Sequence, residues 1–132
     1  MSTINLQDIT FSHSYWIFLL PLICAAADVI TGWIQATVNG VWDSTKMRKG
    51  LFRKAGELLV VVLAYVICKA LIIPMDVTNC VAAYVVIMEL VSVLENLDQA
   101  GVPVPAFVTR NLKKVADSAN QGPDDHPDEE KK

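Results

Sequence analysis

Residues 77–97 read VTNCVAAYVVIMELVSVLENL, an almost uninterrupted apolar run that still contains two glutamates. Two further apolar runs precede it, at residues 16–38 and 55–73. Because about 20 apolar residues are needed to cross the hydrocarbon core of a bilayer as a helix, the first and third runs are long enough and the second lies near the lower limit. The sequence therefore predicts an all-α membrane protein with three transmembrane helices.

The composition of the whole chain agrees with this prediction. Of its 132 residues, 53% are hydrophobic, and they gather in blocks instead of following the amphipathic patterns of a soluble domain. The net charge of -3 is unevenly distributed, since acids dominate the last sixteen residues and bases the segment before the second run. No basic segment is interleaved with aromatic residues, so nucleic acid is not an expected partner.

The boundaries of the runs divide the chain into four parts. Residues 1–14 form a polar N-terminal tail, and residues 15–100 the three-span domain. Gly101, Pro103 and Pro105 end the third helix, after which residues 101–119 form an amphipathic segment. Residues 120–132 are acidic, have little to bury and are predicted to be disordered. Amphipathic interfacial helices are expected at about 42–54 and 105–119.

The basic residues predict the orientation in the membrane. The loop at 34–54 contains five Lys or Arg against one Asp, whereas the N-terminal tail and the 74–78 turn contain none. The positive-inside rule then places that loop and the C-terminus in the cytoplasm, and the N-terminus outside. The residues expected at the cytoplasmic membrane surface are Lys46, Arg48, Lys49, Arg53, Lys54, Arg110, Lys113 and Lys114.

Polar residues recur on one side of the first and third runs. Helical spacing places them in stripes that line a pore or join helices: Asp28, Thr31 and Gln35 in the first run, and Glu89, Ser92 and Asn96 in the third. The small residues Ala25, Gly32 and Ala36 extend the first stripe and suit close helix packing.

Three interpretations of these polar groups remain open. The stripes could line a water-filled lumen built by several copies, or make hydrogen bonds between helices within one bundle. The third interpretation, favoured for Glu57 and Glu95, is that they lie at the membrane boundary. Asp28 and Glu89 are deeper and require the first or the second interpretation, because an unpaired carboxylate in hydrocarbon costs several kcal/mol.

Catalysis and cofactor binding have no support in the sequence. The only histidines, His13 and His126, fall in the predicted tails. The three cysteines are best explained as small apolar residues, and no spacing resembles a metal site. We therefore expect no enzyme activity, no metal and no cofactor.

The order of the motifs resembles a known family. Asp28, Thr31, Gly32 and Ala36 form a D-x-x-T-G-x-x-x-A pattern. Residues 89–97 then read ELVSVLENL, and residues 100–105 read AGVPVP. Together these segments resemble the phage holin family that includes the clostridial toxin-secretion holins, over roughly residues 16–115.

The resemblance implies a homo-oligomer in the bacterial cytoplasmic membrane. Such a protein crosses the membrane several times and forms lesions that release an endolysin, or a toxin, and so time host lysis. The expected partners are other copies of the chain and the lipid bilayer, with the endolysin or toxin as a functional partner that need not touch it. The alternatives are an antiholin-like regulator and a small ion-channel or membrane-scaffold subunit.

Overall fold

The computed structural model describes residues 13–120, and within this range all regular structure is helical. The four helices are α1 (His13–Val38), α2 (Ser44–Ala70), α3 (Asp76–Gln99) and α4 (Ala106–Asn120). The predicted all-helical fold is confirmed for this range. The acidic tail and most of the N-terminal tail lie outside the described residues.

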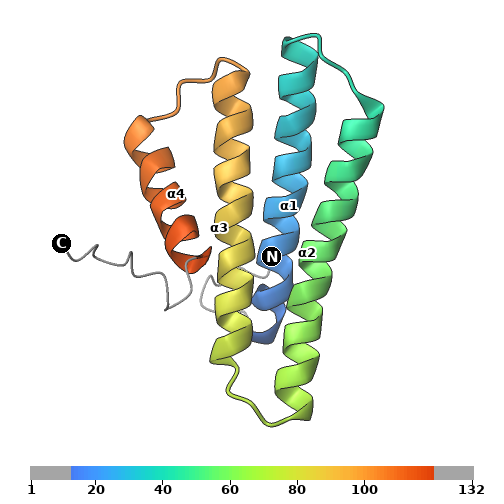
Figure 1. Cartoon of the computed structure of the whole chain (residues 1–132), viewed down its shortest axis with the longest axis vertical. Helices are drawn as coiled ribbons and strands as arrows, with labels where there is room; N and C mark the ends of the chain where they lie inside the picture. Colours follow the sequence, from blue (N-terminus) through green and yellow to red (C-terminus); the bar gives the residue numbers. More distant parts are fainter. Residues whose placement is uncertain (1–12, 121–132) are drawn as a thin grey trace, which may run out of the picture.

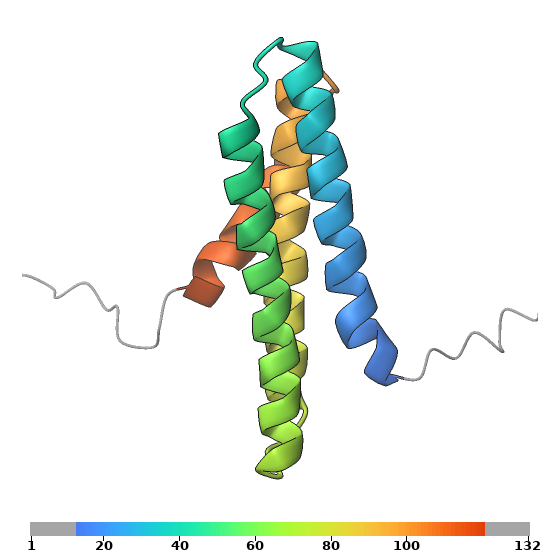
Figure 2. The same cartoon turned by 90° about the vertical axis from the view of Figure 1, so that its right-hand side faces the viewer.

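Helices α1, α2 and α3 run up and down beside one another, and α4 folds back along α3 (Figures 1 and 2). The most extensive packing is between α1 and α3. One end of the bundle therefore holds the end of α1, the start of α2, the end of α3 and the start of α4 (Figure 1). We call it the polar end. There Asn39 donates a hydrogen bond of 3.1 Å to the carbonyl of Gln99.

Local sequence signals set the connections at the polar end. Gly40, the second residue after α1, has a φ of +66°, and Gly101, the second residue after α3, has a φ of +87°. Glycine reaches this left-handed region without a steric penalty, which suits it to end a helix. Asp43 caps α2, because its carboxylate accepts hydrogen bonds from the backbone amides of Thr45 and Lys46.

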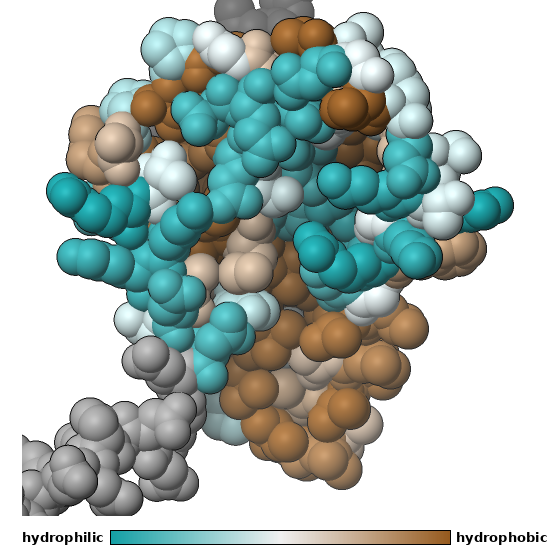
Figure 3. Space-filling view, turned by 45° about the horizontal axis from the view of Figure 1, so that its top comes forward, coloured by the Kyte–Doolittle hydropathy of each residue, from teal (hydrophilic) through white to brown (hydrophobic). Residues whose placement is uncertain are grey.

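The interior is small, and much apolar surface faces outward. Ile17, Val61, Ala82 and Val85 form the apolar core toward the other end of the bundle. Large apolar side chains on the outer faces of α1, α2 and α3 stay exposed, among them Leu22, Ile30, Leu59 and Val66. In Figure 3 polar residues gather over the polar end, with some apolar residues among them, and a mainly apolar surface lies below. An apolar surface of this extent needs a lipid or protein partner.

The start of α2 differs from the sequence prediction. Residues 44–54 do not form a separate interfacial helix but are the first part of the continuous helix α2. No proline interrupts this segment, and the glycines at 50 and 56 lie in the helix interior, where glycine is tolerated.

Two helices are long and apolar enough to cross a membrane by length and composition: α1 over Tyr15–Val38, and α3 over Asp76–Gln99. Among residues 13–120, α2 does not join them, because basic residues and Glu57 fill its first half. The number of membrane crossings and their orientation therefore stay predictions.

Candidate functional site: a buried ion cluster between three helices

A lysine and two carboxylates meet in the middle of the bundle. The Lys54 ammonium group forms ion pairs with Asp28 from α1 and with Glu89 from α3, the second with an Nζ–Oε2 distance of 2.5 Å. The three side chains are only 7%, 7% and 2% exposed. We call this set the charge triad. Because one ammonium faces two carboxylates, its formal charge is -1 when all three groups are ionised.

An amide completes the contact between α1 and α3. Asn96 donates hydrogen bonds to Asp28 Oδ1 at 2.8 Å and to Thr31 Oγ1 at 3.2 Å. The Thr31 hydroxyl in turn donates to the backbone carbonyl of Asp28 at 3.1 Å. Asp28 therefore has partners on both other helices, which removes most of the cost of burying its charge.

The three members of the triad occupy equivalent places on their helices. Asp28 lies ten residues before the end of α1, Glu89 ten before the end of α3, and Lys54 ten after the start of α2. At 1.5 Å per residue this places all three about 15 Å from the polar end. That is about half the thickness of a bilayer's hydrocarbon core.

The sequence contains a signal for the burial of Lys54 that our prediction missed. Lys54, Val61 and Cys68 are the buried residues of α2, and they recur every seven positions. This spacing keeps them on one side of the helix, so Lys54 belongs to the inward side. The prediction that Lys54 lies at the membrane surface is wrong, because its ammonium group is instead held by two buried carboxylates.

The remaining basic residues expected at the membrane surface are all exposed. Lys46, Arg48, Lys49 and Arg53 lie on the outside of α2, and Arg110, Lys113 and Lys114 on the outside of α4. Whether they contact lipid headgroups stays a prediction.

Glu57 lies closer to the interior than a boundary residue would. Its Oε1 forms an ion pair with Arg53 Nε at 3.3 Å, while Oε2 is buried. Among residues 13–120 this buried oxygen has no hydrogen-bond partner. The Glu57 side chain also lies close enough to Glu89 for the two carboxyl groups to interact.

The polar stripes predicted from the sequence meet in part. Asp28, Thr31, Glu89 and Asn96 lie in one network, whereas Gln35 and Ser92 are half-buried on the same helices. Ala25 and Ala36 are buried, and a Cβ on Gly32 would lie 3.6 Å from the Asn96 amide nitrogen. The small residues of α1 therefore allow the close approach of α3 within one chain.

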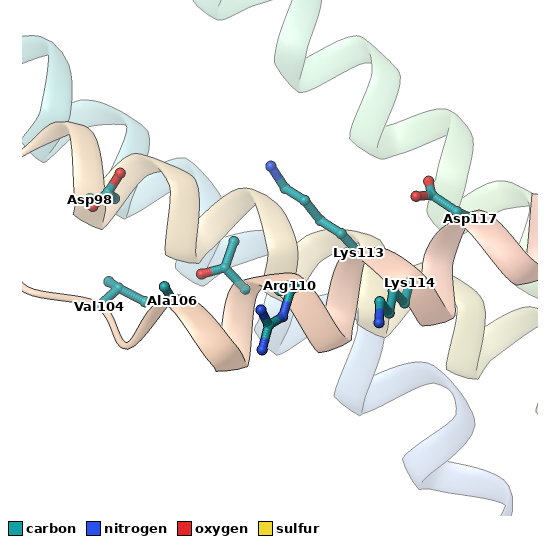
Figure 4. Close-up of a pocket in the computed structure, with 8 residues that line it drawn as sticks. Asp98, Val104, Ala106, Arg110, Lys113, Lys114 and Asp117 are labelled. Carbon is teal, nitrogen blue, oxygen red and sulfur yellow. The ribbon is translucent and has the colours of Figure 1, made fainter.

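A second polar feature lies between α3 and α4. Lys113 pairs with Glu95 at 2.6 Å, and Tyr84 donates a hydrogen bond of 2.8 Å to Asn120. The contact with the Glu95 carboxylate raises the pKa of Lys113 above its ordinary value. Beside the pair is an open cleft of about 520 Å³. In Figure 4 Arg110 and Lys113 leave α4 on different sides.

The chemistry available to these groups is electrostatic. Within residues 13–120, no three His, Cys, Asp or Glu side chains gather in a way that could hold a metal ion. The charge triad offers ion pairing between helices. It can hold α1, α2 and α3 in one register, and it disfavours exposure of any one member to lipid.

Comparison with known proteins identifies the class to which this bundle belongs. The model of the bacteriophage holin family matches residues 8–117, which is most of the chain. The protein therefore belongs to the bacteriophage holin family, whose members are membrane proteins and are not enzymes in general. No curated protein and no solved structure gives a significant match.

Proposed function

We propose that this protein is a holin that oligomerises in the bacterial cytoplasmic membrane and opens lesions at a set time. Through these lesions a cytoplasmic endolysin, or a toxin, leaves the cell. The family match supports the general role, and the separation of apolar and polar surface carries the proposal. The outer faces of the three long helices need lipid or protein partners, whereas the polar end needs water.

Three membrane crossings, with the polar end in the cytoplasm, account best for this surface. Both connections at the polar end, residues 39–43 and 100–105, adjoin helices that begin with basic segments. The short turn between α2 and α3 contains no Lys or Arg. The positive-inside rule then favours a cytoplasmic polar end and an N-terminus outside. In this arrangement α2 crosses with its basic first part toward the cytoplasm.

The charge triad gives the monomer a closed interior. Asp28 and Glu89 bind Lys54 within the same chain, so neither carboxylate needs water or a second copy to be satisfied. Copies of the chain can then accumulate without opening the membrane. Lesions form when enough copies associate through their outer faces.

Expression in bacteria from a tightly controlled promoter tests the proposal, with optical density followed with and without a co-expressed cytoplasmic endolysin. A holin stops growth abruptly at a reproducible time, and rapid lysis follows only when endolysin is present. Growth that continues in both cultures, with the protein found in the membrane, would contradict the proposal. It would favour a scaffold or an antiholin. A halt in growth without endolysin-dependent lysis would indicate a small channel.

A further inference from the structure

The charge triad aligns the depths of the three long helices. Its members lie at one level, each ten residues from the polar end of its helix. Residues between the triad and the polar end therefore occupy the same slab of the bundle on all three helices. In a bilayer that slab corresponds to the cytoplasmic half of the hydrocarbon core.

Within this slab the outer face of α1 is apolar. Ile30, Trp33, Ile34 and Val38 are 56%, 53%, 44% and 61% exposed. No ionisable residue follows Asp28 in α1. This face is suited to lipid along its whole length.

In the same slab one side of the outer face of α2 is basic, next to the exposed apolar residues Leu51 and Phe52. Lys46, Lys49 and Arg53 are exposed and recur at spacings of three and four, so they lie along one side of the helix. We call them the basic flank. Gly50 and Gly56 leave open space beside this side, since an added Cβ would meet no atom within 4 Å.

Snorkelling toward the membrane surface does not account for the whole basic flank. Lys46 lies near the start of α2 and can reach headgroups. Arg53 lies nine residues into the helix, or about 14 Å. Its Nε atom pairs with Glu57, one turn further from the polar end, so the guanidinium group is directed toward the middle of the bundle.

A single surrounding medium cannot suit both faces. Water around the slab would be unfavourable for the exposed apolar face of α1. Lipid around the slab would be unfavourable for the cations of the basic flank on α2. We propose that the basic flank lines the water-filled opening of an assembly of several copies, with α1 turned outward to lipid. This inference rests on the proposed function. In this inference the basic flank lines the opening in place of the stripes that contain Asp28 and Glu89, because both carboxylates are paired with Lys54 within each chain.

The experiment measures water and lipid contact at the basic flank and at reference positions on α1 and α2. The three native cysteines are replaced (Cys24→Ala, Cys68→Ala, Cys80→Ser), and a spin label is attached at one new cysteine in each variant. Arg53→Cys and Lys49→Cys report on the basic flank, Ile30→Cys on α1 at nearly the depth of Arg53, and Leu59→Cys on the apolar half of α2. Each protein is reconstituted in vesicles. Collision rates are then measured with a water-soluble nickel chelate and with lipid-soluble oxygen.

We expect the labels at 49 and 53 to collide several-fold more often with the nickel chelate than the labels at 30 and 59. The labels at 30 and 59 should favour oxygen. Equal access of nickel to 30 and 53 would contradict the inference, because it would place the whole slab outside the hydrocarbon. Low access of nickel to 49 and 53 would also contradict it, because these positions would then face lipid or protein.

Release of a trapped protein from the same vesicles separates this inference from the proposed function. If the cysteine-free chain and the labelled variants release the protein while 49 and 53 stay dry, the lining is wrong and the holin function stands. If the cysteine-free chain is inserted in the vesicle membrane but releases no protein, the proposed function is wrong. The inference about the basic flank is then wrong as well, because there is no opening for it to line.

Discussion

Lys54 Nζ lies 2.5 Å from Glu89 Oε2, in an ion pair that joins α2 to α3 with both side chains almost fully buried. The same ammonium group pairs with Asp28 on α1. One side chain therefore links all three long helices at mid-height. The stability of the closed bundle should depend on it more than on any exposed cation of the chain.

Removal of the lysine tests this dependence. Lys54→Met leaves two buried carboxylates without their cation, and loss of one partner of a buried pair costs about 3–5 kcal/mol. We expect a large loss of unfolding free energy in detergent, measured by denaturant titration. Lys49→Met is the matched control, because Lys49 is exposed on the same helix, and it should change the free energy little.

Neutralising the whole triad should restore much of that loss. The triple variant Asp28→Asn, Lys54→Met, Glu89→Gln removes the three charges of the triad together, so none of its members is left as a buried charge without a partner. We expect it to be more stable than Lys54→Met alone. A triple variant as unstable as the single one would show that the three groups do not act as a unit.

Gly32 provides a graded test of the contact between α1 and α3. A Cβ there would lie 3.6 Å from the Asn96 amide nitrogen, which is an ordinary contact, so Gly32→Ala should be tolerated. Gly32→Leu should displace Asn96 and break its hydrogen bonds to Asp28 and Thr31. We expect a loss of about 1–3 kcal/mol for the larger residue, as in overpacked cores. Equal stability of both variants would contradict this packing.

The docking of α4 can be tested at its buried alanine. Ala116 is 5% exposed, so Ala116→Leu should push α4 from α3 and make residues 106–120 more sensitive to protease. Asn111→Leu, on the exposed side of α4, is the control and should leave cleavage unchanged. Unchanged protection in Ala116→Leu would mean that α4 does not depend on this contact.

The ion pair of α4 should also respond to pH. Because Glu95 raises the pKa of Lys113 above its ordinary value, the pair stabilises docking fully below that ordinary value. The stabilisation is lost as pH rises through the higher value of the docked form. Protease protection of α4 should therefore be constant around neutral pH and decline only in strong alkali. A decline near pH 7 would contradict this assignment.

The helices could be predicted from the sequence because their signals are local. The three apolar runs correspond to α1, α3 and the second half of α2, and Gly101 with the two following prolines ends α3 as expected. The amphipathic segment expected at 105–119 is helix α4, Ala106–Asn120. The start of α2 was missed because a helix whose first half is basic and second half apolar resembles two separate elements.

The pairing within the site could not be predicted, since it depends on the register between helices. Asp28 and Glu89 were identified as groups that need partners, but the sequence left a lumen and an interhelical bond equally open. The choice is made by Lys54, whose inward position follows from the spacing to Val61 and Cys68. Asn96 reaches Asp28 because Gly32 allows α1 and α3 to pack closely, which places the two side chains within hydrogen-bond distance.

The most direct test of the central claim is release from vesicles loaded with both a small dye and a protein of endolysin size. Purified wild-type chain is added at increasing ratios of protein to lipid. We predict no release at low ratios, where closed monomers accumulate, and joint release of dye and protein above a threshold. Release of dye alone at every ratio would indicate a small channel and would contradict the account.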